Sequence, residues 1–287
     1  MRTIFLFIIL SIFFSLVATA QSRVVEETDT YKKIDTTELQ VYKFRPESIS
    51  GPTPAIAFFH GGGWSGGDPS VFFGACRRFA RLGYQTFSFQ YRLSRTSSGK
   101  TPHPDITPVE CVKDARSAMR WLRQNADELK IDPAKIVAAG HSVGGHLALS
   151  TAMIGDVNES VDDLSIDPTP DALVIFSGTS NTIEAWCDRM LGEKRGMIWT
   201  ISPYHNVEND LPPALAFHGT SDCIVPFWTM REFSAKMKSA ENDFTLIRTE
   251  GKGHHLGPED EIHGGIWNDE MMVEVDSFLQ RQMILPE

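Results

Sequence analysis

Apolar residues follow two kinds of spacing along the chain, and the two kinds alternate. A short continuous apolar run, as over 55–60, predicts a strand buried on both faces, and an alternating run, as over 38–44, predicts a half-exposed strand. Apolar positions that recur every three or four residues predict helices. Strands that alternate with helices form a mostly parallel sheet with helices on both faces, and such sheets bind ligands at the carboxyl ends of their strands. The predicted strands are 38–44, 55–60, 85–91, 136–139, 172–176, 214–217 and 244–249, and the predicted helices are 71–82, 108–129, 144–154, 227–239 and 266–282. We therefore expect an α/β protein, preceded by a polar segment over 21–34.

The beginning of the chain has the pattern of an export signal. Arg2 precedes an apolar stretch from Ile4 to Val17, and the small-residue sequence Ala18-Thr19-Ala20 follows it. The stretch is shorter than the roughly 20 residues of a membrane span, so a signal peptide over 1–20 is predicted, with an uncleaved anchor as the alternative. We expect a single domain over 21–287 that is secreted or periplasmic and not stably anchored in a membrane.

The charge balance excludes two classes of partner. The chain has 27 Lys and Arg against 37 Asp and Glu, a net charge of -10, and no basic run. Nucleic acids and anionic membrane surfaces attract positively charged proteins. Neither is an expected partner.

Four cysteines, Cys76, Cys111, Cys187 and Cys223, follow the predicted signal. An oxidising compartment permits disulfides, and four cysteines allow three pairings. Cys187 with Cys223 is the favoured pair, because both lie in loops at the same predicted edge of the sheet, and buried free thiols are the alternative. The spacing matches no zinc pattern, so no metal is expected.

Two glycine clusters follow predicted strands. Gly140-His141-Ser142-Val143-Gly144 fits G-x-S-x-G and lies between the strand 136–139 and the helix 144–154. A serine on such a sharp turn needs small neighbours, and the turn projects its hydroxyl above the sheet. His60-Gly61-Gly62-Gly63-Trp64 ends another strand, where glycines leave N–H groups free to approach a developing oxyanion. One acyl-transfer site explains both clusters, whereas a phosphate-binding loop would need a different spacing.

With these motifs the sequence resembles the esterases of the α/β-hydrolase superfamily, over nearly the whole chain after the signal. The resemblance implies an α/β-hydrolase fold of about eight mostly parallel strands and catalytic residues in the order serine, acid, histidine. The stretch 218–226, HGTSDCIVP, resembles the HGxxDxxVP loop of the family and makes Asp222 the acid. The stretch 251–254, GKGH, resembles its GxGH ending and makes His254 the base. The neighbouring His255 departs from the family pattern and is the alternative base.

The resemblance also implies a mechanism. Ser142 attacks an ester carbonyl, His254 accepts the proton of the hydroxyl, and Asp222 orients the imidazole. The oxyanion is held by the backbone amides of Gly62, Gly63 and Val143. This chemistry requires neither a metal nor an organic cofactor.

The same motifs resemble those of bacterial carbohydrate esterases, such as acetyl xylan and feruloyl esterases. Only the connection 178–211 has room for a cap, with one predicted helix over 182–191, so the cap is minimal and the site open. We expect acetyl or hydroxycinnamoyl esters of a carbohydrate as substrates, with Trp64 and Trp186 as a platform for sugar or aromatic groups. A formamidase-like or peptidase-like amidase is the alternative enzyme, and a catalytically dead hydrolase fold that only binds is the alternative from another class. The sequence leaves the oligomeric state open.

Overall fold

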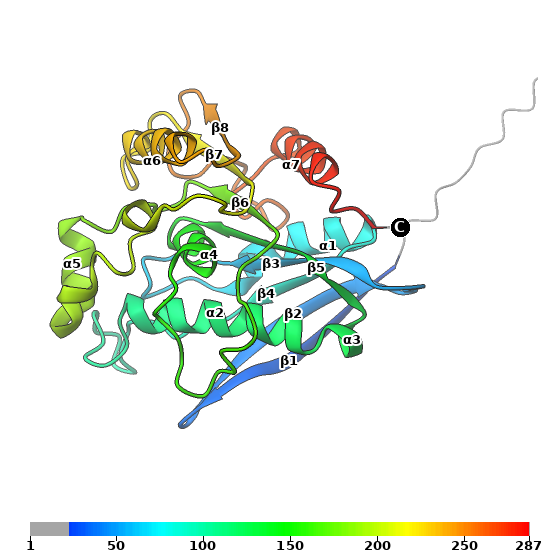
Figure 1. Ribbon diagram of the computed structural model, residues 1–287, viewed down its shortest axis with the longest axis horizontal. Helices are drawn as coiled ribbons and strands as arrows, with labels where there is room; N and C mark the ends of the chain where they lie inside the picture. Colours follow the sequence, from blue (N-terminus) through cyan, green and yellow to red (C-terminus); the bar gives the residue numbers. More distant parts are fainter. Residues whose placement is uncertain (1–22, 287) are drawn as a thin grey trace, which may run out of the picture.

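Eight strands form one sheet in the order β1-β2-β4-β3-β5-β6-β7-β8 in the computed structural model, which describes residues 23–286 (Figure 1). The contacts of β2 with β1 and β4 are antiparallel, and all other neighbours are parallel. The strands are β1 Val24–Ile34, β2 Thr37–Pro46, β3 Thr53–Phe59, β4 Gln85–Phe89, β5 Ile131–His141, β6 Ala172–Phe176, β7 Ala214–Gly219 and β8 Phe244–Thr249. The predicted α/β sheet is confirmed.

Helices cover both faces of this sheet. Successive side chains of a strand point to opposite faces, so Ala57 and Phe59 of β3 join one apolar core, and Ile56 and Phe58 join the other. The first core is covered by α2, α4, α5 and α6, and the second by α1 and α7 (Figure 1). The helices are α1 Phe73–Arg81, α2 Pro108–Gln124, α3 Ala126–Leu129, α4 Val143–Met153, α5 Ala185–Leu191, α6 Phe227–Ser239 and α7 Asp269–Arg281. Short 3-10 helices are η1 Pro69–Phe72, η2 Gly192–Met197 and η3 Pro203–Asn206.

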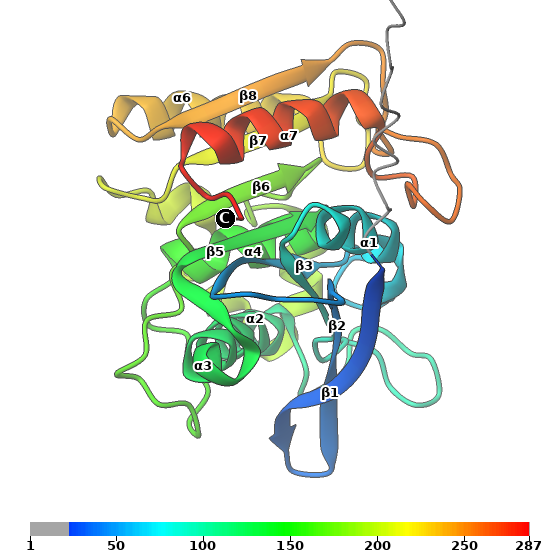
Figure 2. The same cartoon turned by 90° about the vertical axis from the view of Figure 1, so that its right-hand side faces the viewer.

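The N-terminal segment differs from its prediction. Most of the stretch 21–34, which is polar in sequence, lies in strand β1, and β1 forms an antiparallel hairpin with β2 at the edge of the sheet opposite β8 (Figure 2). The residues from Glu26 to Asp29 are exposed in this edge strand, and Glu26 forms an ion pair with Arg77 of α1 at 2.7 Å. Charged side chains protect such an edge from pairing with other chains, which explains a strand without an apolar pattern.

The predicted helix over 108–129 is two helices. Asn125 separates α2 from α3, and its side-chain amide donates to the carbonyl of Trp121 at 2.7 Å. An asparagine that bonds to nearby backbone competes with the helical hydrogen bonds, so the first helix ends there.

The favoured disulfide is not present. All four cysteines are free thiols, and three of them, Cys76, Cys111 and Cys187, are buried, whereas Cys223 is exposed. Cys187 belongs to the apolar core under α5, so its side chain does not reach the surface loop of Cys223. The alternative of buried free thiols holds for three of the four.

The predicted signal peptide at 1–20 lies outside the described residues. Of the helices within 23–286, none combines the length and the apolar character that a membrane crossing needs.

Candidate active site

Ser142 occupies the sharp turn between β5 and α4. Its backbone has φ 57° and ψ -122°, a conformation that residues other than glycine rarely adopt. The turn is held by the Ser142 amide, which donates to the carbonyl of Phe176 at 3.0 Å. Small neighbours are required, because a Cβ on Gly140 would lie 2.2 Å from the Gly144 carbonyl oxygen, and one on Gly144 would lie 2.0 Å from that of Phe59. The glycines of this motif therefore allow a strained serine at the carboxyl end of the sheet.

Asp222 and His254 meet at the same edge, although they follow different strands. Asp222 comes after β7 and His254 after β8, and His254 Nδ1 lies 2.8 Å from Asp222 Oδ2. The other carboxylate oxygen accepts from the amides of Ile224 and Val225, both at 2.9 Å. Burial opposes ionisation of Asp222, but hydrogen bonds from His218 and His254 outweigh it and lower its pKa well below the usual range. Asp222 is therefore an anion that fixes the proton of His254 on Nδ1.

His254 and Ser142 line one cleft. Among the hydrogen bonds of residues 23–286, none joins the two side chains directly. Such bonds are often long in an enzyme without substrate and shorten when the reacting carbonyl is bound. The arrangement leaves Nε2 as the nitrogen of His254 that could accept a proton.

A second histidine supports the loop that carries His254. The His141 ring centroid lies 4.8 Å from that of His254, and its Nε2 is 3.3 Å from the His254 carbonyl oxygen. Burial, with the nearby His254, lowers the pKa of His141 to about 3. The ring is therefore neutral at ordinary pH, and it acts as a packing and hydrogen-bonding group.

The first glycine cluster brings backbone amides to the serine. A Cβ on Gly61 would lie 2.9 Å from His141 Nδ1 and 3.2 Å from the Cβ of Ser142, so a side chain here would have to displace both neighbours. Gly62 has φ 120°, and its carbonyl accepts from the amides of Ser65 and Gly66 at 3.1 and 2.9 Å. Within the described part of the chain, the amides of Gly62 and Gly63 donate to no carbonyl or side chain. Val143 opens α4, where the first amides have no helical partner. Gly62 and Gly63 thus line the same cleft as Ser142, and Val143 follows the serine in the chain.

His60 holds the base of this loop. Its Nδ1 lies 2.8 Å from the Gly61 carbonyl oxygen, and its carbonyl accepts from the Tyr91 hydroxyl at 2.9 Å. Burial lowers the pKa of His60, so the ring is a neutral partner of the backbone.

A known family model covers most of the chain. The BD-FAE family model matches residues 39–237. The chain belongs to the BD-FAE family. The matched segment contains Ser142, Asp222 and both glycine clusters, whereas His254 lies beyond its end.

Esterases resemble the chain in both sequence and structure. Thermogutta terrifontis esterase 2 is 34% identical, with a TM-score of 0.80, and the match covers 91% of this chain and 96% of that chain. Esterase LipC of Mycobacterium tuberculosis is 24% identical over 73% of this chain and 55% of its own length, and carboxylesterase NlhH of the same organism is 31% identical over 46% and 38%. The chain spans about half the length of LipC and less of NlhH. This BD-FAE protein therefore has the α/β-hydrolase fold.

The predicted aromatic platform of the BD-FAE protein is wrong for Trp64. The Trp64 side chain has no exposed surface, and its ring stacks on Trp186 at 4.9 Å and meets His146 edge-on at 5.2 Å. Trp186 is partly buried, and neither tryptophan is among the described residues that line the cleft. Trp64 has φ 57°, and in that conformation it occupies the core between α4 and α5. It anchors the glycine loop instead of contacting a ligand.

The cleft itself is open and measures about 400 Å³. Apolar side chains of Val71, Ile224 and Ile266 contribute to its walls, together with the glycines 61–63, 67 and 264. The connection between β6 and β7 carries only α5, η2 and η3, as expected for a minimal cap.

His255 also lines the cleft, but it does not contact Asp222. Its Nδ1 is 3.0 Å from Glu259 Oε1, and 53% of its side chain is exposed. The carboxylate that orients an imidazole beside Ser142 is thus bonded to His254. This geometry favours His254 over His255 as the base.

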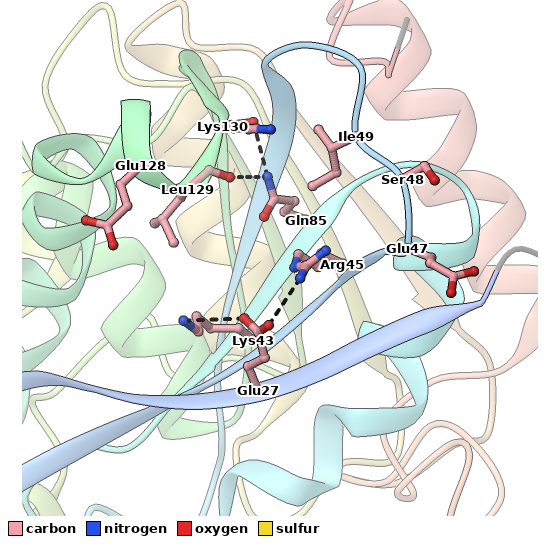
Figure 3. Close-up of a pocket in the computed structure, with 10 residues that line it drawn as sticks. All are labelled: Glu27, Lys43, Arg45, Glu47, Ser48, Ile49, Gln85, Glu128, Leu129 and Lys130. Carbon is pink, nitrogen blue, oxygen red and sulfur yellow. Dashed lines mark hydrogen bonds and ion pairs between the residues drawn. The ribbon is translucent and has the colours of Figure 1, made fainter.

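A larger cleft of about 580 Å³ lies at the other end of the strands (Figure 3). Its charged side chains partly neutralise one another, since Glu27 lies 3.1 Å from Arg45 and 3.7 Å from Lys43. Gln85 uses its amide to hold the carbonyls of Leu129 and Lys130. No serine, histidine and carboxylate meet among its lining residues, so the catalytic candidates remain at the carboxyl edge.

Metal chemistry has no evident ligand set in the described range. No group of three or more His, Cys, Asp or Glu side chains within 23–286 is arranged to hold an ion. His263 lies 2.8 Å from Asp260 and forms no metal-binding group with His254 and His255.

Proposed function

We propose that this protein is a serine esterase that hydrolyses short-chain acyl esters through an acyl-enzyme on Ser142. The observation that carries the proposal is the bond of 2.8 Å between His254 and Asp222, in a cleft that also contains Ser142 and the free amides after His60. The BD-FAE family and the esterases named above support it. The roles of Ser142, His254 and Asp222 are part of the proposal.

The chemistry follows from the proton positions. Asp222 accepts from Nδ1–H, so Nε2 of His254 carries the lone pair that removes the proton of the Ser142 hydroxyl. The alkoxide attacks the carbonyl carbon, and the amides of Gly62, Gly63 and Val143 stabilise the oxyanion, each by about 3 kcal/mol where such donors have been removed in other enzymes. His254 then protonates the leaving alcohol and later activates the water that releases the acid.

The size of the cleft favours a short acyl group. Its apolar walls and its volume of about 400 Å³ suit a small acid, and its open mouth leaves room for a bulky alcohol. Solved forms of Thermogutta terrifontis esterase 2 contain propionate and butyrate. We extend the proposal to acetyl or hydroxycinnamoyl esters of carbohydrates as substrates. The protein is proposed to be secreted after removal of residues 1–20.

Hydrolysis of p-nitrophenyl acetate, butyrate and palmitate by the purified protein tests the reaction class and the acyl length. We expect acetate and butyrate to be hydrolysed much faster than palmitate, and Ser142→Ala to abolish the activity. A preference for palmitate would overturn the short-chain assignment. Faster hydrolysis of p-nitroacetanilide than of p-nitrophenyl acetate would favour the amidase.

Covalent labelling separates an enzyme from a binding protein of the same fold. Thermogutta terrifontis esterase 2 is phosphorylated by paraoxon. We expect the Ser142 hydroxyl to displace p-nitrophenolate from paraoxon, or fluoride from a fluorophosphonate probe, and to carry one phosphoryl or phosphonyl group, with no addition to Ser142→Ala. Absence of labelling in the wild type would favour the binding protein.

Mass spectrometry of the exported protein tests the signal peptide. A mature chain that begins at Gln21 would support the signal peptide, and a retained N-terminus would contradict it.

A further inference from the structure

Few side chains of the Ser142 cleft can form a hydrogen bond to a polar alcohol. Its walls consist largely of glycine backbone and of the apolar Val71, Ile224 and Ile266. The polar side chains among its described lining residues are Ser142 and three histidines: His141, His254 and His255. Any hydrogen bond from a side chain to the substrate, outside the reacting atoms, must therefore come from a histidine.

Two of these histidines are already engaged. His254 bonds to Asp222 through Nδ1, and its Nε2 is the proton acceptor of the proposed reaction. His141 is buried, and its Nε2 bonds to the His254 carbonyl. His255 is the histidine that is half-exposed in the same cleft and has a nitrogen without a partner in the described residues.

Glu259 determines which nitrogen of His255 is available. A carboxylate only accepts hydrogen bonds, so the contact of 3.0 Å with Oε1 places the proton of the neutral imidazole on Nδ1. Nε2 then carries a lone pair and accepts a hydrogen bond. The same contact favours one orientation of the ring, with Nε2 on the side away from the carboxylate.

His255 lies on the side of the cleft where the alcohol part of an ester would bind in the proposed mechanism. The His255 ring centroid lies 6.0 Å from that of His254, which protonates the leaving oxygen in the proposed mechanism, and 5.9 Å from that of His141. A group beside the leaving oxygen is therefore close to His255. In a partly acylated sugar that group is a free hydroxyl on a neighbouring carbon.

We propose that His255, held by Glu259, is a specificity residue that accepts a hydrogen bond from a free hydroxyl of the alcohol next to the ester. The proposal rests on the esterase function and deepens it, because it assigns recognition of a hydroxylated alcohol to one side chain. The hydrogen bond contributes to binding of the alcohol and takes no part in bond breaking.

Two acetate esters that differ in hydroxyl groups test the proposal. One is a monoacetate of methyl β-xyloside, and the other is cyclohexyl acetate, whose ring has no hydroxyl. In His255→Phe, which keeps a planar ring without nitrogen, we expect kcat/KM for the xyloside ester to fall roughly fivefold to tenfold. The value for cyclohexyl acetate should stay within about twofold.

Variants of the neighbouring carboxylate separate recognition from folding. Glu259→Gln retains an oxygen that accepts from Nδ1, so it should keep most of the preference for the xyloside ester, whereas Glu259→Ala should lose much of it. Glu261→Ala is the matched control, because Glu261 is an exposed glutamate of the same loop without an ion pair in the described range. Glu261→Ala should leave kcat/KM unchanged for both esters.

The outcomes are distinct. If wild-type protein hydrolyses both esters and His255→Phe changes their ratio by less than twofold, the specificity role is wrong while the esterase function stands. Equal loss on both esters, with an unchanged thermal midpoint, would also overturn it, because His255 would then act in the reaction itself. Failure of the wild type on both esters and on p-nitrophenyl acetate would count against the esterase function.

Discussion

His254 Nδ1 lies 2.8 Å from Asp222 Oδ2, although 32 residues separate the two along the chain. The contact exists because β7 and β8 are parallel neighbours, and both loops leave the sheet at its carboxyl edge. Asp222 also accepts from two amides of its own loop, so its position is determined before the histidine binds. The imidazole therefore meets a carboxylate that is already in place.

Asp222→Asn should reduce kcat for p-nitrophenyl acetate by roughly 10³ to 10⁴-fold, because an amide no longer fixes the tautomer or stabilises the imidazolium. Steady-state kinetics at pH 7.5 would measure the change. Asp163→Asn, at an exposed carboxylate distant in sequence, is the control and should keep its activity. A loss smaller than tenfold would show that Asp222 is not the acid of the site.

Gly62→Ala should reduce kcat in a protein that remains folded. Gly62 has φ 120°, and an added Cβ would lie 2.2 Å from the Gly66 carbonyl oxygen, so the loop must shift and move its amides away from the oxyanion. Loss of one such donor costs roughly 10² to 10³-fold in kcat. Gly155→Ala is the matched control, since nothing lies within 4 Å of a Cβ there. Unchanged kinetics in Gly62→Ala would place the oxyanion elsewhere.

Trp64→Ala should destabilise the protein by about 3 to 5 kcal/mol, as expected when a fully buried tryptophan leaves a cavity. Urea denaturation measures the free energy of unfolding. Trp199, with 56% exposure, is the control, and Trp199→Ala should cost less than about 1 kcal/mol. A stable Trp64→Ala variant that loses only affinity for sugar esters would restore the platform that the structure contradicts.

Acid should destabilise the protein through buried histidines. Burial lowers the pKa of His146 to about 4 and that of His141 to about 3, both from 6.5. The unfolded chain therefore binds more protons between pH 6.5 and 4, so stability is complete above pH 6.5 and falls as the pH decreases through that window. Each histidine contributes up to about 1.4 kcal/mol per pH unit.

His146→Gln tests this dependence. Glutamine can keep the bond to the Ile201 carbonyl, which His146 Nε2 makes at 2.7 Å, but it does not titrate. The free energy of unfolding should then decrease by about 1 kcal/mol less per pH unit between pH 6 and 5 than in the wild type. Equal slopes in the two proteins would mean that His146 is not protonated on unfolding in this range.

The sequence by itself determined the parallel core and the two glycine-rich turns at its carboxyl edge. Continuous apolar runs predict buried strands such as β6 and β7. Glycine fits where two backbone segments leave no room for a Cβ atom, as at Gly140 and Gly144. These are local constraints, so they are visible in the order of residues. The serine, acid and histidine order depended on the family resemblance.

Only the tertiary structure decided which side chains face the ligand. Trp64 follows the glycine loop and has the residue type of a sugar platform, but its neighbours α4 and α5 bury it. The hydrogen bond between His255 and Glu259 was also visible only in the structure, and β1 is a strand because it pairs with β2. The burial of Trp64 is set by contacts between distant segments, and hydrogen-bond partners and strand pairing depend on a geometry that the pattern of residue types does not contain.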